Sequence, residues 1–168
     1  MQLVVIRHAI AQEREEFAPT GRDDSLRPLT DRGKAKMKRA AAGLRELVPE
    51  INVLAASPFT RAQQTARIVA DEYDGLRVLT TSSLEPDSEL DEFAEWLRSR
   101  RGDVVAVVGH EPHLGTLVTW LMTGIEESRV PLRKGAACLL EFPAKPARGT
   151  ARLHWALTAS QLGRLADR

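Results

Sequence analysis

The chain begins MQLVVIRHAIAQ (residues 1–12), a stretch in which an apolar run ends abruptly in Arg7 and His8. Residues 4–6 are all β-branched, and a short, continuously apolar run of this kind is typical of a strand that is covered on both faces of a sheet. A turn after the strand would sooner use Gly, Asn or Asp, and helix capping does not require Arg-His. The pair therefore indicates a functional site at the end of a buried strand.

Similar apolar runs recur along the chain and alternate with stretches of helical periodicity. Further strands are expected at residues 52–57, 77–80, 103–110, 136–142 and 151–157. Helices are expected at 29–50, 57–73, 88–100, 112–124 and 160–167, whereas residues 9–30 are polar and read as irregular. This alternation predicts an α/β fold of three layers, with a mostly parallel central sheet flanked by helices. Because the last two strands are close in sequence, one late strand is expected to run antiparallel.

Local signals mark the ends of the first two helices. Thr30 is a candidate N-cap of the first helix, Leu44, Leu47 and Val48 are expected on its apolar face, and Pro49 is expected to end it. Ser57 followed by Pro58 reads as the N-cap and first position of the second helix.

The composition is that of an ordinary globular protein, and a single domain over residues 1–168 is expected. Lys and Arg number 24 against 23 Asp and Glu, a net charge of +1, so no general positive field favours nucleic acid. The apolar run at the N-terminus is too short for a signal peptide or a membrane span. The single cysteine, Cys138, excludes an intrachain disulfide framework. We therefore expect a cytoplasmic protein that binds neither membranes nor nucleic acid.

Polar side chains that follow the first, second and fourth strands should meet at one edge of the sheet, where open α/β sheets bind ligands. Arg7 and His8 follow the first strand, Arg61 follows the second, and His110 follows the fourth. Arginine clamps phosphate oxygens, and histidine can act as a nucleophile or proton carrier at neutral pH. The set predicts phosphoryl chemistry: one neutral imidazole attacks phosphorus, while the arginines and a protonated second imidazole stabilise the redistributed charge.

Three motifs resemble those of the histidine phosphatase superfamily, whose members are phosphoglycerate mutase-like in fold. They are RHA (7–9), SPFTRAQQT (57–65) and VVGHEP (107–112), in the family's order and approximate spacing. The segment DDSLRPLTDRGKAKM (23–37) extends the resemblance, which is strongest to the SixA-type phosphohistidine phosphatases. Ala9 stands where the superfamily usually has Gly.

By this resemblance His8 is the nucleophile that becomes phosphorylated, Arg7 and Arg61 clamp the phosphoryl group, and His110 is the second pocket histidine. Arg27 would be a further phosphate or substrate contact. The resemblance implies a phosphatase that needs no cofactor. The expected substrate is phosphohistidine on a protein, which suggests a role in signal transduction.

The superfamily's usual proton donor, a glutamate, has no clear counterpart in this sequence. Glu85 is the candidate we retain, and the alternatives are Asp24, Asp87 and Glu111. An alkoxide leaving group needs a placed acid, whereas an imidazole can already be protonated near neutral pH. A weak or absent acid therefore fits phosphohistidine better than a sugar phosphate.

Other interpretations stay open at this point. The substrate could be a small phosphate monoester derived from a sugar or nucleotide, with specificity set by residues 10–26 and 80–90. A non-catalytic phosphate-binding module is a third reading. No metal is expected, because HEPH (110–113) lacks the H-E-x-x-H spacing of helical zinc sites. The basic run RGKAKMKR (32–39) reads as a solvated face or as a docking face for an acidic partner.

Overall fold

The computed structural model describes residues 1–167, which contain one six-stranded sheet. The strands are β1 (Gln2–Arg7), β2 (Val53–Ala56), β3 (Val78–Thr80), β4 (Val104–Gly109), β5 (Ala137–Glu141) and β6 (Arg152–Leu157). Their order across the sheet is β3-β2-β4-β1-β5-β6. The first four of these pair in parallel, whereas β5 runs antiparallel to both of its neighbours. The predicted mostly parallel sheet with one antiparallel late strand is confirmed.

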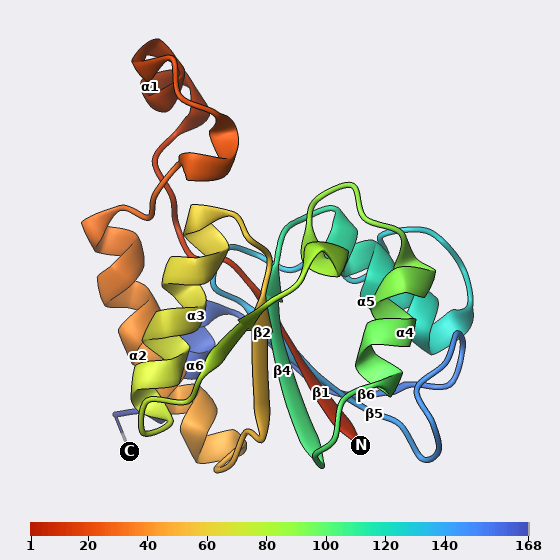
Figure 1. Cartoon of the computed structure of the whole chain (residues 1–168). Coiled ribbons are helices and arrows are strands. Elements are labelled where there is room, and N and C mark those ends of the chain that lie inside the picture. Colours follow the sequence, from red (N-terminus) through yellow and green to blue (C-terminus); the bar gives the residue numbers. More distant parts are fainter. Residues whose placement is uncertain (168) are drawn as a thin grey trace.

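Helices cover both faces of the sheet (Figure 1). The α-helices are α1 (Arg14–Phe17), α2 (Asp31–Leu47), α3 (Thr60–Glu72), α4 (Leu90–Arg98), α5 (His113–Thr123) and α6 (Ala159–Leu165). Helices α2, α3 and α6 pack on one face, and α4 and α5 pack on the other. The predicted three layers are therefore confirmed.

The central strand β1 shows why its sequence is continuously apolar. Val4 and Ile6 point into the core beneath α2, α3 and α6, while Leu3 and Val5 point into the core beneath α4 and α5. All four side chains are fully buried, and burying each contributes about 1.5–3 kcal/mol. A strand that is buried on both faces has no position for a polar residue until its carboxyl end, where the sheet meets the surface.

Helix α2 begins where the sequence predicts. The Thr30 hydroxyl accepts the N–H of Gly33 at 3.0 Å, which makes Thr30 the N-cap. A side chain on Gly33 would collide with the main-chain oxygen of Ile10, so glycine lets the helix start directly against the segment that follows His8. The expectation for Leu47 is wrong: it is 39% exposed, because the helix ends there and Val48 takes the buried place.

Residues 10–30 form an arm that stands out beyond the ends of α2 and α3 (Figure 1). Its base is closed by a bridge between Ala11 and Leu29 and by a hydrogen bond of 2.9 Å from the Gln12 N–H to the Pro28 oxygen. The arm holds α1 and two short 3₁₀ helices, η1 (Ala18–Thr20) and η2 (Asp24–Leu26); a third, η3 (Ser82–Leu84), follows β3. The expectation of an irregular segment was therefore incomplete, because these turns are too short to show helical periodicity.

No helix within residues 1–167 has the length and apolar character needed to cross a membrane.

Candidate active site

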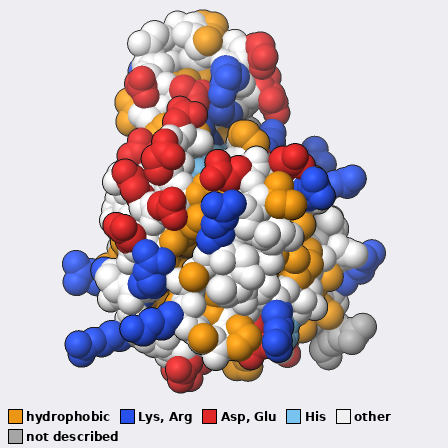
Figure 2. All heavy atoms as spheres, turned by 90° about the vertical axis from the view of Figure 1, so that its right-hand side faces the viewer, with side chains coloured by type: hydrophobic (Ala, Val, Ile, Leu, Met, Phe, Trp, Pro, Cys, Tyr) orange, Lys and Arg blue, Asp and Glu red, His pale blue; other side chains and the backbone are white. Residues whose placement is uncertain are grey.

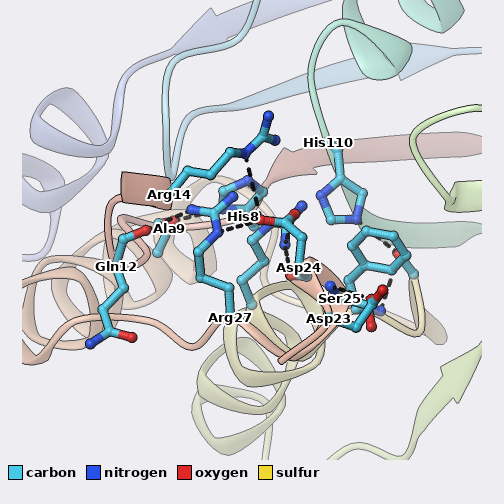
Figure 3. A network of polar contacts seen from close by, with 12 residues as sticks. His8, Ala9, Gln12, Arg14, Asp23, Asp24, Ser25, Arg27 and His110 are labelled. Carbon is cyan, nitrogen blue, oxygen red and sulfur yellow. Dashed lines mark hydrogen bonds and ion pairs between the residues drawn. The ribbon is translucent and has the colours of Figure 1, made fainter. Parts of the chain in front are cut away.

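Strands β2, β4 and β1 are neighbours in the sheet, so their carboxyl ends bring the predicted residues together. His8 follows β1 directly, and His110 follows β4 directly. The centroids of the two imidazole rings lie 5.3 Å apart, and Figure 3 shows both rings beside the polar residues of the arm. Two histidines that are 102 positions apart in sequence thus face one site.

His8 is buried, with 7% of its surface exposed, and its Nδ1 lies 2.7 Å from the main-chain oxygen of Ala9. A carbonyl oxygen can only accept a hydrogen bond, so Nδ1 carries the proton and Nε2 keeps a free lone pair. The pKa of His8 is lowered to about 3, chiefly because the ring is buried; the hydrogen bond to Ala9 raises it, and the charges of Arg61, Arg7 and Arg27 lower it. His8 is therefore a neutral imidazole with one unprotonated nitrogen at pH 7.

The backbone next to His8 is tied to α3 by Thr65, a fully buried residue. The Thr65 hydroxyl accepts the N–H of Ala9 at 3.0 Å and donates to the main-chain oxygen of Arg61 at 2.7 Å. One side chain thus fixes the spacing between the histidine segment and the helix that carries Arg61. Our sequence reasoning missed this role, although Thr65 is the last residue of the motif at 57–65.

His110 is held by Ser57, the residue that follows β2. The Ser57 Oγ lies 2.9 Å from His110 Nε2, and it also accepts the N–H of Phe59 at 3.3 Å. The hydroxyl proton is then free to be donated to Nε2, which places the ring proton on Nδ1. His110 Nδ1 is buried and has no hydrogen-bond partner among residues 1–167.

The surroundings of His110 favour a neutral ring. Burial lowers its pKa to about 2, and the neighbouring His8, Arg61, His113 and Arg7 act in the same direction. The ring is therefore neutral, and it offers one N–H rather than a full positive charge. A bound phosphoryl group would favour the protonated form, because it brings negative charge next to the ring.

Ser57 was predicted to cap the second helix, and that prediction is wrong. Helix α3 begins at Thr60, and its N-cap is Phe59. Ser57 lies three positions before the helix and uses its side chain on His110 instead. Pairs such as Ser-Pro favour helix starts locally, but the nearby end of β4 offers this hydroxyl a buried partner.

Arg7 and Arg61 have unused hydrogen-bond donors inside the protein. Arg61 is 4% exposed, and burial lowers the pKa of both guanidinium groups; guanidinium nevertheless stays charged at neutral pH. Arg7 Nη1 donates to the main-chain oxygen of Leu132 at 2.8 Å. Four buried side-chain nitrogens lack a partner within residues 1–167, and three of them are Arg7 Nε, Arg61 Nε and His110 Nδ1. Unpaired buried donors are costly, so the site is built to receive an acceptor.

Arg27 reaches the same site from the arm, and it is also buried, with 9% exposed. Its Nη1 donates to the main-chain oxygen of Gln12 at 2.6 Å, and its Nε donates to the Asp24 carboxylate at 2.9 Å. Asp24 also pairs with Arg61 at 3.3 Å. The arm therefore contributes one buried arginine and one carboxylate to the site, and the carboxylate connects that arginine to Arg61.

Glu85 lies beside the site rather than against the histidines. It lines a shallow hollow of about 260 Å³ together with Phe59 and Asp87, and the Phe59 ring lies 5.0 Å from that of His110. Glu111 has a different position, because its Oε1 accepts the N–H of Leu132 at 2.8 Å and so fixes the loop that holds Arg7. Glu85 therefore shares a hollow with Phe59, a neighbour of His110, and it stays the candidate proton donor.

Carboxylates gather next to this hollow, on the side of the molecule that carries α4 and α5 (Figure 2). Between the hollow and the end of α4, the exposed carboxylates are Asp87, Glu89, Asp91, Glu92 and Glu95. The positive charge of the site is thus a local feature that comes from converging arginines, in keeping with a net charge of +1. No group of three or more His, Cys, Asp or Glu residues within 1–167 is arranged to hold a metal ion.

Comparison with known proteins agrees with this fold and site. The sequence profile of the histidine phosphatase superfamily (branch 1) matches residues 3–94. The chain belongs to the histidine phosphatase superfamily, and it is accordingly a phosphatase enzyme. It is 32% identical over 130 residues to phosphohistidine phosphatase SixA of Escherichia coli (strain K12), an alignment that covers 74% of this chain and 76% of that protein.

Two further relatives cover most of the chain. An uncharacterized protein of Picosynechococcus sp. (strain ATCC 27264 / PCC 7002 / PR-6) is 31% identical over 137 residues, covering 80% of this chain and 81% of that one. The solved structure of the protein histidine phosphatase SixA complexed with tungstate superposes with a TM-score of 0.82 at 25% identity. It covers 96% of this chain and 99% of that chain. The expected likeness to SixA-type enzymes is therefore confirmed.

Proposed function

We propose that this phosphatase removes the phosphoryl group from phosphohistidine on a protein, with His8 as the nucleophile. The observation that carries the proposal is the pairing of a neutral His8, with Nε2 unprotonated, and three buried donors that have no acceptor. A phosphoryl group would supply an electrophilic phosphorus for His8 and several acceptor oxygens for the three donors. The likeness to SixA supports phosphohistidine as the substrate.

In the first step His8 Nε2 forms a bond to phosphorus while the bond from phosphorus to the substrate's imidazole nitrogen breaks. That nitrogen leaves with the electron pair of the broken bond and takes up a proton. Arg7, Arg61 and the N–H of His110 stabilise the oxygens as charge spreads over them. Arg27 is a further contact on the same group.

In the second step water attacks the phosphorus of phosphorylated His8. The oxygen of water forms the new bond, His8 Nε2 leaves with the electron pair, and the water's extra proton is released to solvent. The products are inorganic phosphate and the original neutral His8. Imidazole is a far better leaving group than an alkoxide, so both steps can proceed without the strong acid that phosphate esters require.

The alternative substrate is a small phosphate monoester of sugar or nucleotide origin. Its turnover would need a proton donor, for which Glu85 in the hollow beside Phe59 is the candidate. Phosphohistidine does not depend on such a donor, which favours it over the ester. No cofactor takes part in either version.

The proposal extends to the setting of the enzyme. A single domain over the whole chain is supported by one sheet with a core on each face. A cytoplasmic location and a role in signal transduction remain proposals, and the lone buried thiol of Cys138 is compatible with them.

The test compares turnover of a phosphohistidine peptide with turnover of a panel of small phosphate monoesters. We expect the peptide to have the higher kcat/KM, and we expect His8→Ala to abolish turnover of both. Radiolabelled phosphohistidine substrate should leave acid-labile, base-stable label on the wild-type chain and none on the variant. Faster hydrolysis of the esters would overturn the substrate, and undiminished turnover by the variant would overturn the mechanism.

A further inference from the structure

The arm places one carboxylate among three arginines at the candidate site. Asp24 Oδ1 lies 2.9 Å from Arg27 Nε and 3.6 Å from Arg14 Nε, and its Oδ2 lies 3.3 Å from Arg61 Nη1. Figure 3 shows the Asp24 carboxylate between Arg14 and Arg27, close to His8. Two of these arginines, Arg27 and Arg61, are the buried cations that a phosphoryl group would meet.

Asp24 is an anion in this arrangement at neutral pH. Burial alone would raise the pKa of the carboxyl group, but the hydrogen bond from Arg27 and the charges of Arg61, Arg27 and Arg14 outweigh it, and the pKa lies below its usual range. The carboxylate therefore neutralises part of the positive charge that draws phosphate to the site. It is a resident anion, present before any substrate arrives.

Asp24 occupies only one of the nitrogen atoms of the Arg61 guanidinium, and Nε has no acceptor. Arg61 Nη1 is occupied, because it donates to the main-chain oxygen of Asp24 at 2.9 Å and lies next to the carboxylate. Arg61 Nε remains buried without an acceptor. A phosphoryl oxygen that binds Nε would share one guanidinium with a carboxylate, so it would be held less tightly than by a guanidinium with no other anion beside it.

We infer that Asp24 acts through the charge of its carboxylate on Arg27 and Arg61: it limits how tightly these arginines retain inorganic phosphate, which speeds release of the product. The inference rests on the proposed function insofar as Arg61 and Arg27 bind the phosphoryl group. The physical reason is that attraction felt equally by substrate, transition state and product adds nothing to kcat. Such attraction slows departure of an anionic product, and a fixed negative charge beside the arginines reduces it.

The test measures anion binding directly, by isothermal titration calorimetry with inorganic phosphate and with tungstate. The variant is Asp24→Asn, because asparagine keeps the size of the side chain and an oxygen that can accept the hydrogen bond from Arg27 Nε. Removing one negative charge this close to the bound anion should lower the dissociation constant of both anions about tenfold. In turnover assays the inhibition constant of phosphate should fall by a similar factor, and kcat should fall.

The matched control is Asp23→Asn. Asp23 is the preceding residue and is exposed, and its Oδ1 accepts the N–H of Ser25 at 2.9 Å rather than pairing with an arginine. Because the charge of Asp23 is exposed to water and pairs with no arginine in the described residues, the dissociation constants of the control should stay within about twofold of wild type. Asp24→Ala is a second variant in which both dissociation constants should also fall, and thermal unfolding confirms that each variant is folded.

Unchanged anion binding in both Asp24 variants would overturn the inference, since the carboxylate would then lie outside the field of the bound anion. Weaker binding would overturn it too, because Asp24 would then serve only to hold the arginines in place. Binding is measured without substrate, so failure of the proposed function would be seen separately. If Asp24→Asn binds phosphate more tightly but the wild-type chain does not hydrolyse phosphohistidine, the inference about Asp24 stands and the proposed function is wrong.

Discussion

The Nδ1 of His8 and the main-chain oxygen of Ala9 lie 2.7 Å apart, so the residue that follows the histidine sets its tautomer. The backbone of Ala9 is also tied to α3, because its N–H donates to the Thr65 hydroxyl at 3.0 Å. The family's usual glycine is replaced by alanine at this position without loss of the contact, since only backbone atoms of residue 9 take part.

This contact predicts where the phosphoryl group is carried. With Nδ1 protonated, only Nε2 has a lone pair for attack on phosphorus, so the phosphorylated enzyme should carry the group on Nε2 of His8. Phosphorus and nitrogen NMR of the trapped intermediate distinguishes the two ring isomers. Phosphorylation at Nδ1 would contradict the prediction, and Thr65→Val, which removes the hydroxyl that holds Ala9, should lower the rate of labelling.

Ser57→Ala tests the hydrogen bond that orients His110. The change leaves His110 Nε2 without its partner at a buried position, which should cost about 1–3 kcal/mol of stability. Because the ring can then turn, we expect kcat to fall about tenfold to hundredfold, with urea unfolding and steady-state kinetics as the two measurements. Ser160→Ala, at an exposed position on α6, is the control and should change neither stability nor kcat. Equal kinetics for Ser57→Ala and wild type would show that His110 does not need the hydrogen bond from Ser57.

The two buried imidazoles predict a loss of stability in mild acid. In the folded chain the pKa of His8 is about 3 and that of His110 about 2, whereas an unfolded histidine has a pKa of about 6.5. Between these values the unfolded chain binds protons that the folded chain does not, so the free energy of unfolding falls as pH drops from 6.5 towards 3. Each group adds up to about 1.4 kcal/mol per pH unit to the slope of the free energy of unfolding against pH. This contribution to the slope fades above about pH 7, where the unfolded histidines are also neutral.

Urea unfolding at pH 7.5, 6.0 and 5.0 measures this dependence. The buried His113 also has a pKa lowered by burial and adds to the slope. His110→Asn removes one of these titrating groups, so the slope of stability against pH should become shallower even if the variant is less stable at every pH. A flat profile between pH 7.5 and 5.0 in the wild-type chain would contradict the prediction, as would an identical slope in the variant.

The sequence was sufficient to predict which side chains meet. Arg7 is the last residue of β1, and His8 and His110 directly follow β1 and β4. Arg61 lies in the first turn of α3, the helix after β2. Because parallel neighbours in a sheet end at one edge, the convergence of these residues follows from topology. Arg27 depended instead on the family resemblance. Its path to the site runs through the arm, whose short helices carry no periodic signal.

Contacts between distant segments could not be read from local patterns. Ser57-Pro58 has the features of a helix start, and only the three-dimensional approach of His110 gives the serine its other use. Asp24 was considered as a proton donor, but its environment is set by Arg61, 37 positions later. The basic run at 32–39 illustrates the same limit, since part of it lines a hollow with α6, residues that sequence alone leaves far apart.

The role of Glu85 can be decided by changing the leaving group rather than the enzyme alone. A phosphate monoester releases an alkoxide that must be protonated, whereas phosphohistidine releases an imidazole that can take a proton from water near neutral pH. Glu85 lines the hollow beside Phe59, whose ring lies 5.0 Å from that of His110. We therefore expect Glu85→Gln to leave kcat on a phosphohistidine peptide within about twofold of wild type and to lower kcat on a small phosphate ester about tenfold or more.

Asp91→Asn, at an exposed position on α4, is the control for a lost negative charge and should change kcat on neither substrate. A large loss on the phosphohistidine peptide would mean that its imidazole, too, leaves with a proton from Glu85, and the argument from the leaving group would fail.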